Sequence, residues 1–205
     1  MNKKTNQTKQ LAFLGLLFAI VFILSETSLG TIPIGPLSIT LNMIPVAISA
    51  IVLREKGGVL VGGFFGLLSF LQALGIGVPS VLGGFLVSIN PFFTFIVCFG
   101  ARVITGYLLG LVSRILNKNG STSYLSIGVV GFLAPLLNFT FFMGFLWLLF
   151  GFDPTFLEYL HSTLVKTSMA VFVGGIFVSN TILEIVSTTI LVGVICGAFK
   201  KAKML

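Results

Sequence analysis

Charge is scarce in this sequence. Charged residues make up 8% of the 205 residues, whereas hydrophobic residues make up 56%. Soluble domains carry about 25% charged residues, so this composition excludes an ordinary soluble domain. Apolar stretches alternate with short polar joints, and we predict an all-α membrane protein that forms a single integral membrane domain over residues 1–205. Six transmembrane helices are expected, over residues 11–29, 41–53, 59–74, 91–116, 124–150 and 172–199.

Residues that carry chemistry are also few. The sequence has one histidine, His161, and two cysteines, Cys98 and Cys196, which lie inside apolar runs and are most simply small hydrophobic residues. It contains no P-loop, no H-E-x-x-H pair and no G-x-S-x-G elbow, and only five acidic residues. We therefore predict no metal site, no cofactor bound by this chain and no enzymatic activity.

Basic residues outnumber acidic ones, with a net charge of +7. They lie at the ends of apolar stretches rather than in a basic stripe with aromatic platforms, which favours the lipid bilayer and disfavours nucleic acid as a partner. If both termini are cytoplasmic, Lys166 alone lies on the outer side, and ten basic residues lie on the inner side. These ten are Lys3, Lys4, Lys9, Arg54, Lys56, Arg114, Lys118, Lys200, Lys201 and Lys203. We predict a multi-pass protein of the cell membrane with cytoplasmic N- and C-termini.

The first apolar stretch follows three lysines, as a signal peptide would. No small-x-small cleavage site follows it, and Glu26 interrupts the region that would be cut. We expect this stretch to be retained as the first span.

The three outer connections are long and apolar, unlike the short polar inner joints. Proline and glycine at these positions prevent regular helix and permit tight turns: Gly30, Pro33, Gly35, Pro36, Gly75, Gly77 and Pro79. Irregular backbone at a membrane surface must be buried in protein or line a cavity. Two interpretations stay open: the connections pack on helix ends, or they cap a ligand cavity on the outer side, which their shared character favours.

Arg102 lies in the middle of an apolar run. It lies about twelve residues below the outer start of its span, at a depth similar to those of Asn138 and Glu184 on two other spans. A buried arginine costs about 2.5–3.5 kcal/mol even on the most lenient scale, so it needs a partner. That partner is either Glu184 or an anion that enters from outside, and the two are not exclusive.

Further polar residues are candidates for the wall of the site. Asn180 lies one turn from Glu184 on the same helix face, and Asn42, Gln72 and Asn90 lie at the ends of spans. Each of the last three could equally be a helix cap or an interface group. Pro135 should free a backbone carbonyl near Gly131, close to Asn138.

One pair of small residues indicates a contact with another protein. Gly15 and Ala19 form a small-xxx-small pair on the first span, which carries few other polar or bulky groups, and such a pair lets another helix approach closely. Similar pairs at Gly62/Gly66, Gly106/Gly110 and Gly193/Gly197 are expected mainly to serve packing inside the chain.

These features together resemble the substrate-binding S component of energy-coupling factor (ECF) vitamin transporters. The resemblance covers nearly the whole chain: six spans, cytoplasmic termini, outer loops and a small-xxx-small first helix, where the family's Ala-xxx-Ala reads Gly15-xxx-Ala19. It implies that the chain binds a vitamin near the outer surface. It also implies docking onto a transmembrane coupling subunit with two ATPase subunits, which use the ATP.

Residues 32–72, "IPIGPLSITLNMIPVAISAIVLREKGGVLVGGFFGLLSFLQ", are most similar to the pantothenate-type subgroup of this family. Pantothenate has a carboxylate, two hydroxyls and an amide. The resemblance implies that Arg102 receives the carboxylate and that polar side chains serve the other groups: Asn138, Gln72, Asn42 and Asn90.

Three alternatives remain. The vitamin could be another one, such as riboflavin, pyridoxine or folate, although one tryptophan and three tyrosines mildly disfavour a large planar ligand. The chain could be a scaffold subunit without a ligand, in which Arg102 and Glu184 pair. A membrane-embedded enzyme acting on lipid would need carboxylates or histidine beyond Glu184, and the sequence offers almost none.

Overall fold

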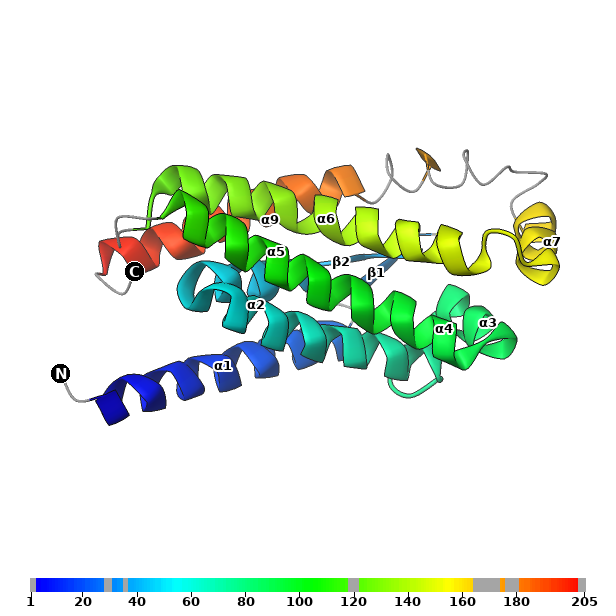
Figure 1. The fold of residues 1–205 in the computed structure, drawn as a ribbon, viewed down its shortest axis with the longest axis horizontal. Helices are drawn as coiled ribbons and strands as arrows, with labels where there is room; N and C mark the ends of the chain where they lie inside the picture. Colours follow the sequence, from blue (N-terminus) through cyan, green and yellow to red (C-terminus); the bar gives the residue numbers. More distant parts are fainter. Residues whose placement is uncertain are drawn as a thin grey trace.

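The chain forms an elongated bundle of helices, shown in Figure 1. This computed structural model describes residues 3–27, 31–34, 37–117, 122–163, 174–175 and 181–202. In the described part the long helices are α1 (Lys3–Glu26), α2 (Met43–Ala73), α5 (Ala101–Leu116), α6 (Tyr124–Phe150) and α9 (Ile182–Lys201). The shorter helical elements are α3 (Val81–Ile89), α4 (Pro91–Phe95), the π-helical η1 (Ile96–Gly100) and α7 (Pro154–Thr163).

Four helical segments of the described part are long and apolar enough to cross a membrane. They are Gln7–Glu26, Pro91–Leu116, Tyr124–Phe150 and Ile182–Lys201. The second joins α4, η1 and α5 end to end, and it has the predicted bounds 91–116. The third also has its predicted bounds, and the last runs from Ile182, whereas residues 176–180 of the predicted span lie outside the described ones.

The second and third predicted spans form one element that turns back on itself. α2 is helical on both sides of Arg54, whose φ of 56° and ψ of −143° break the helix. A Cβ placed on Gly57 would lie 2.5 Å from the carbonyl oxygen of Ser49, so the chain reverses there. The first arm, residues 43–53, is roughly 16 Å long at 1.5 Å per residue, too short to cross a bilayer core of about 30 Å.

The second arm of α2 packs against α5 with backbone almost touching backbone. A Cβ on Gly58 would clash with the carbonyl oxygen of Gly106, and one on Gly62 would lie 2.5 Å from the carbonyl oxygen of Arg102. Gly66 lies equally close to η1, where a Cβ would be 2.8 Å from the Cα of Phe99. The glycine repeat is thus used inside the chain, as predicted for Gly62/Gly66 and for Gly106.

Strands β1 (Thr31–Ile34) and β2 (Leu37–Thr40) form an antiparallel pair between α1 and α2. In their register Thr31 faces Thr40 and Ile34 faces Leu37. The helical prediction is confirmed for the long elements, and this short pair is an exception to it. Pro33 lies in β1, so the described part of this connection is not helical, as expected, and the two extended segments satisfy backbone groups by pairing with each other.

The other two outer connections are more regular than predicted. α3 begins at Ser80, whose hydroxyl oxygen accepts a hydrogen bond from the Gly83 backbone nitrogen at 3.1 Å. α7 follows Asp153, whose carboxylate accepts from the Thr155 and Phe156 nitrogens at 2.9 and 3.1 Å. The expectation of irregular backbone was therefore wrong for both segments. The turn before α3 does use Gly75 and Gly77, whose φ angles are 83° and 82°.

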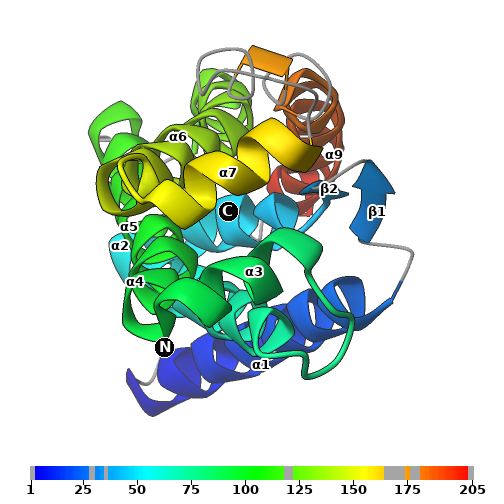
Figure 2. The ribbon, with the colours of Figure 1, turned by 90° about the vertical axis from the view of Figure 1, so that its right-hand side faces the viewer.

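The two ends of the bundle differ in character. The first described residues of α1, the Arg54 turn and the last residues of α9 lie at one end, while α3 and α7 lie at the other (Figures 1 and 2). At the α3/α7 end the rings of Phe85 and Tyr159 stack with centroids 4.1 Å apart. We call this the α7 end and the other the terminal end. Both ends of the chain therefore point the same way, although Lys118, Lys166 and Lys203 lie outside the described residues.

Candidate ligand-binding site

Arg102 is buried inside the bundle, with 7% of its surface exposed. It lies two residues after the end of η1, where the helix widens by one residue, and widened turns of this kind often occur at functional sites. Its side chain folds back along the helix, so that Nη1 donates to the carbonyl oxygens of Val97 at 3.2 Å and Cys98 at 3.0 Å. The guanidinium therefore points toward the α7 end.

Two aromatic rings enclose this guanidinium. Its Cζ lies 5.1 Å from the ring centroid of Phe65 on α2 and 4.8 Å from that of Phe142 on α6. A cation over an aromatic face gains about 0.5–2 kcal/mol, the larger values applying where water is excluded. Neither ring was predicted from the sequence, because the chain has 22 phenylalanines and only the tertiary structure selects these two.

Part of the binding capacity of Arg102 is unused. The buried Nε atom has no hydrogen-bond partner among the described residues. Glu184 is also buried, at 6% exposure, but the described part of the chain contains no ion pair between it and Arg102. A direct structural pair between the two, one of the predicted alternatives, is not formed.

Asn138 lies on α6 and is 8% exposed, and its Oδ1 atom has no partner within the described residues. It belongs to a polar layer on α5, α6 and α9 that lies between two hydrophobic clusters. On α6, Ala134 belongs to the cluster near the terminal end and Met143 to the cluster near the α7 end, with Asn138 between them. The buried polar residues at this level are Arg102, Thr105, Asn138 and Glu184, and Thr188 lies further toward the terminal end.

Thr105 and Thr188 were not predicted from the sequence. Both are fully buried, and neither hydroxyl has a hydrogen-bond partner in the part of the chain that the structure describes. The available signal was their spacing: Thr105 follows Arg102 by three residues and Thr188 follows Glu184 by four, which places each on the same helix face.

The three predicted wall residues at the ends of spans make structural bonds. Asn42 donates to the hydroxyl of Ser25 at 3.0 Å, and Gln72 donates to the Ser25 carbonyl oxygen at 2.7 Å. Asn90 caps α4, since its Oδ1 accepts from the Phe93 nitrogen at 3.1 Å. Asn180 lies outside the described residues, and whether any of the four contacts a ligand stays a prediction.

The predicted docking pair lies on the outside of the bundle. Gly15 and Ala19 are exposed on α1, and a Cβ placed on Gly15 would meet no atom within 4 Å. This exposure agrees with an approaching partner helix but equally with contact to lipid.

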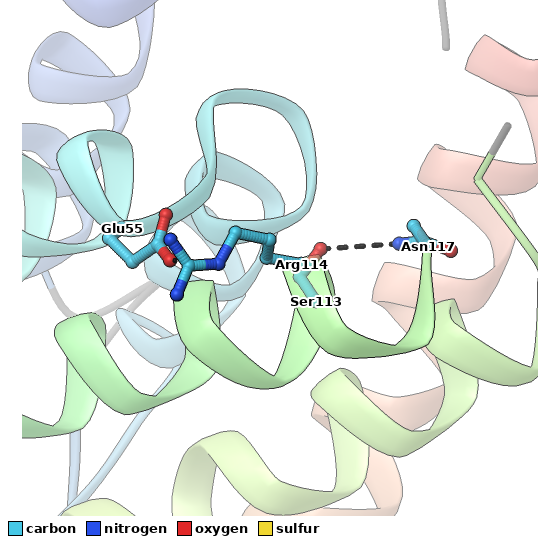
Figure 3. Close-up of polar contacts among 4 residues, drawn as sticks. All are labelled: Glu55, Ser113, Arg114 and Asn117. Carbon is cyan, nitrogen blue, oxygen red and sulfur yellow. Dashed lines mark hydrogen bonds and ion pairs between the residues drawn. The ribbon is translucent and has the colours of Figure 1, made fainter. Parts of the chain in front are cut away.

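Most of the described basic residues gather at the terminal end. Arg114 on α5 pairs with Glu55 beside the Arg54 turn, with Nε and Oε1 2.9 Å apart (Figure 3). Lys200 lies over the ring of Tyr124, 4.1 Å from its centroid. Asn117 fixes the next turn, donating to the Ser113 hydroxyl at 3.4 Å (Figure 3) and to the Ser126 hydroxyl at 2.8 Å.

The chain is similar to known transport proteins along nearly its whole length. A protein-family model described as "ECF transporter, substrate-specific component" matches residues 9–196. This chain belongs to that family. The family is a component of transporters rather than of enzymes, as the sequence predicted.

Two relatives carry names that include a cargo. The "Pantothenate transporter PanT" of Leuconostoc mesenteroides subsp. mesenteroides is 34% identical over 140 residues, which cover 65% of this chain and 65% of that protein. The "Pantothenic acid transporter PanT" of Lactococcus lactis subsp. cremoris is 27% identical over 212 residues, which cover 98% of each chain. The family resemblance predicted from the sequence is confirmed, and its subgroup agrees with these names.

Proposed function

We propose that this chain is the substrate-specificity subunit of an ECF-type, ATP-driven importer and that it binds pantothenate. The observation that carries the proposal is a buried guanidinium, Arg102, which has no acidic partner in contact with it among the described residues. Pantothenate has one carboxylate, and both named relatives are pantothenate transporters. A carboxylate that reaches Arg102 would supply a counter-charge in direct contact with the guanidinium.

The environment of Arg102 suits a reversible anion site. Phe65 and Phe142 hold the guanidinium without neutralising it, because aromatic rings carry no net charge. Arg102 is therefore preorganised, with Nε still available as a donor.

The orientation of the chain completes the proposal. The α7 end faces the outside, since Arg54, Lys56, Arg114, Lys200 and Lys201 lie at the terminal end, and basic residues favour the cytoplasmic side. Pantothenate then enters from the outside, and the N- and C-termini lie in the cytoplasm. The outer connections cap the ligand in this arrangement.

Delivery requires a partner, since the proposed importer uses ATP and this chain lacks a P-loop. We assign the exposed Gly15/Ala19 face of α1 to a transmembrane coupling subunit that carries two ATPase subunits. The chain itself binds cargo and the bilayer, without a cofactor or a metal.

Binding to the purified protein tests the proposal. Calorimetric titration in detergent should give saturable pantothenate binding without ATP. Arg102→Ala should weaken it by about 10- to 100-fold, the range expected for a lost hydrogen bond to a charged group. Arg114→Ala, at an exposed arginine, is the matched control and should bind normally.

The alternatives give different results in the same experiment. The alcohol formed by reducing the pantothenate carboxylate should bind weakly to the unmodified protein and equally weakly to Arg102→Ala. Saturable binding of riboflavin, pyridoxine or folate in place of pantothenate would identify that vitamin as the cargo. If none of these compounds binds, the result would favour a scaffold subunit without a ligand. Unchanged pantothenate affinity in a folded Arg102→Ala variant would overturn the role of Arg102.

A further inference from the structure

Most hydroxyl groups in these helices are satisfied by their own helix. Thr94, Thr140 and Thr189 each donate to the carbonyl oxygen four residues earlier, at 2.8, 2.8 and 2.6 Å. Thr105 differs, because its hydroxyl is fully buried and bonds to nothing within the described residues. An unmade hydrogen bond of a buried group is costly unless a bound molecule completes it.

Helix register brings Thr105 level with Asn138. α5 and α6 run antiparallel: Gly100 lies opposite the Phe145 ring, and Asn117 bonds to Ser126 at the terminal end. Continuing this register between the two contacts places Thr105 beside the turn of α6 that carries Asn138. Side chains lean toward the start of their own helix, so the Thr105 side chain leans toward the α7 end and the Asn138 side chain toward the terminal end.

α9 brings Glu184 to the same level. A Cβ on Gly131 would lie 3.2 Å from the Cα of Thr189, and Gly197 lies opposite Tyr124, so α9 is antiparallel to α6. The same register places Asn138 beside the start of α9 near Glu184. Thr188 lies level with Gly131 and thus further toward the terminal end, which separates it from the Thr105 and Asn138 level.

Arg102 and Thr105 are separated along the helix axis. Their Cα atoms are about 4.5 Å apart in rise, and the arginine side chain extends further toward the α7 end. The bundle therefore offers a cation toward the α7 end and, about one turn deeper, the Thr105 hydroxyl and the Asn138 Oδ1 at a similar depth, neither with a hydrogen-bond partner among the described residues. This arrangement fits a ligand that has a carboxylate at one end and hydroxyl groups at the other.

We propose that Thr105 is a specificity-determining residue, whose hydroxyl bonds a hydroxyl group of the ligand while Arg102 receives the carboxylate. The proposal rests on the proposed function and adds to it the orientation of pantothenate: the carboxylate lies toward the outside and the hydroxylated end lies deep. A site with a buried polar group left unpaired discriminates strongly against an analogue that lacks the matching hydroxyl.

Two analogues, each with one pantothenate hydroxyl replaced by hydrogen, test this assignment by calorimetric titration. The unmodified protein should bind one of them about tenfold or more weakly than pantothenate. Thr105→Val, which removes the hydroxyl and keeps the shape, should lower pantothenate affinity about tenfold and leave the affinity for that analogue unchanged. Thr105→Ser, which keeps the hydroxyl, should still bind pantothenate more tightly than the analogue.

Thr94→Val is the matched control, because Thr94 is also fully buried but its hydroxyl bonds within its own helix. It should keep the affinities of the unmodified protein. Thr105→Val should melt at the same or a higher temperature without ligand, since no bond within the described residues is lost. If Thr105→Val melts at a lower temperature, or still prefers pantothenate over the analogue as strongly as the unmodified protein does, the assignment of Thr105 alone is overturned. If the unmodified protein does not bind pantothenate, the proposed function is overturned.

Discussion

Gly58 and Gly106 bring the backbones of α2 and α5 into contact, since a Cβ on either residue would clash with the carbonyl oxygen of the other. Without a strong hydrophobic drive between helices in lipid, close backbone packing of this kind is a main source of association. The contact lies one turn from Arg102, whose own carbonyl faces Gly62. Rigid packing of α2 on α5 therefore positions both Arg102 and the Phe65 ring above it.

Gly58→Ala should destabilise the protein by about 3 kcal/mol, because neither backbone can move away without disturbing the crossing. Thermal unfolding in detergent measures the effect. Gly15→Ala, at a position with nothing within 4 Å, is the control and should be neutral or slightly stabilising. Equal melting temperatures for the two variants would contradict the close packing.

Arg54→Gly should stabilise the protein by about 1 kcal/mol. Arg54 holds a φ of 56° and a ψ of −143°, a conformation that costs a side-chain-bearing residue energy and glycine almost none. Lys56→Gly, two residues on within α2, should instead destabilise by about 1 kcal/mol because glycine disfavours helix. Opposite shifts in melting temperature are expected, and a drop for Arg54→Gly would argue against a strained turn.

Arg114→Gln should cost less than about 1 kcal/mol despite breaking the ion pair with Glu55. The Arg114 side chain is 54% exposed and that of Glu55 19%, so water and salt screen the pair. The difference in melting temperature between the unmodified protein and the variant should be small at low salt and should shrink further at high salt. A large loss at both salt concentrations would show that the pair is more important than its exposure indicates.

Gln72→Ala should loosen the end of α1 by removing the hydrogen bond to the Ser25 carbonyl, at a cost of about 1 kcal/mol. Hydrogen–deuterium exchange should rise in the last turn of α1 and remain unchanged in α6. Gln10→Ala, on the exposed part of α1, serves as the control and should leave exchange in that last turn as it was.

Phe142→Leu should weaken pantothenate binding, because the leucine fills much of the space but lacks the aromatic face that holds the guanidinium. We expect a loss equivalent to about 0.5–2 kcal/mol. Phe132→Leu, at a phenylalanine that is 47% exposed, should bind as the unmodified protein does. If both variants bind equally well, the ring does not position Arg102.

Local signals explain why some elements were predicted well and others were missed. The spans 91–116 and 124–150 have the predicted bounds because continuous hydropathy and clear polar ends specify a membrane helix. α7 was missed although Asp153 and Pro154 together form a helix-start signal, because this connection shares the apolar character of the other two outer connections and was predicted to be irregular with them. The strand pair was missed because pairing depends on a second segment rather than on either segment alone.

The amino-acid sequence by itself determined the membrane class, the positions of the long helices and the burial of one arginine, because these follow from hydropathy and from the cost of charge in an apolar medium. Only the tertiary structure decided what surrounds that arginine. Helix crossing and register selected Phe65 and Phe142 from many phenylalanines and brought Thr105 level with Asn138. Contacts between distant segments depend on how close two backbones can approach, and here glycine packing sets that distance.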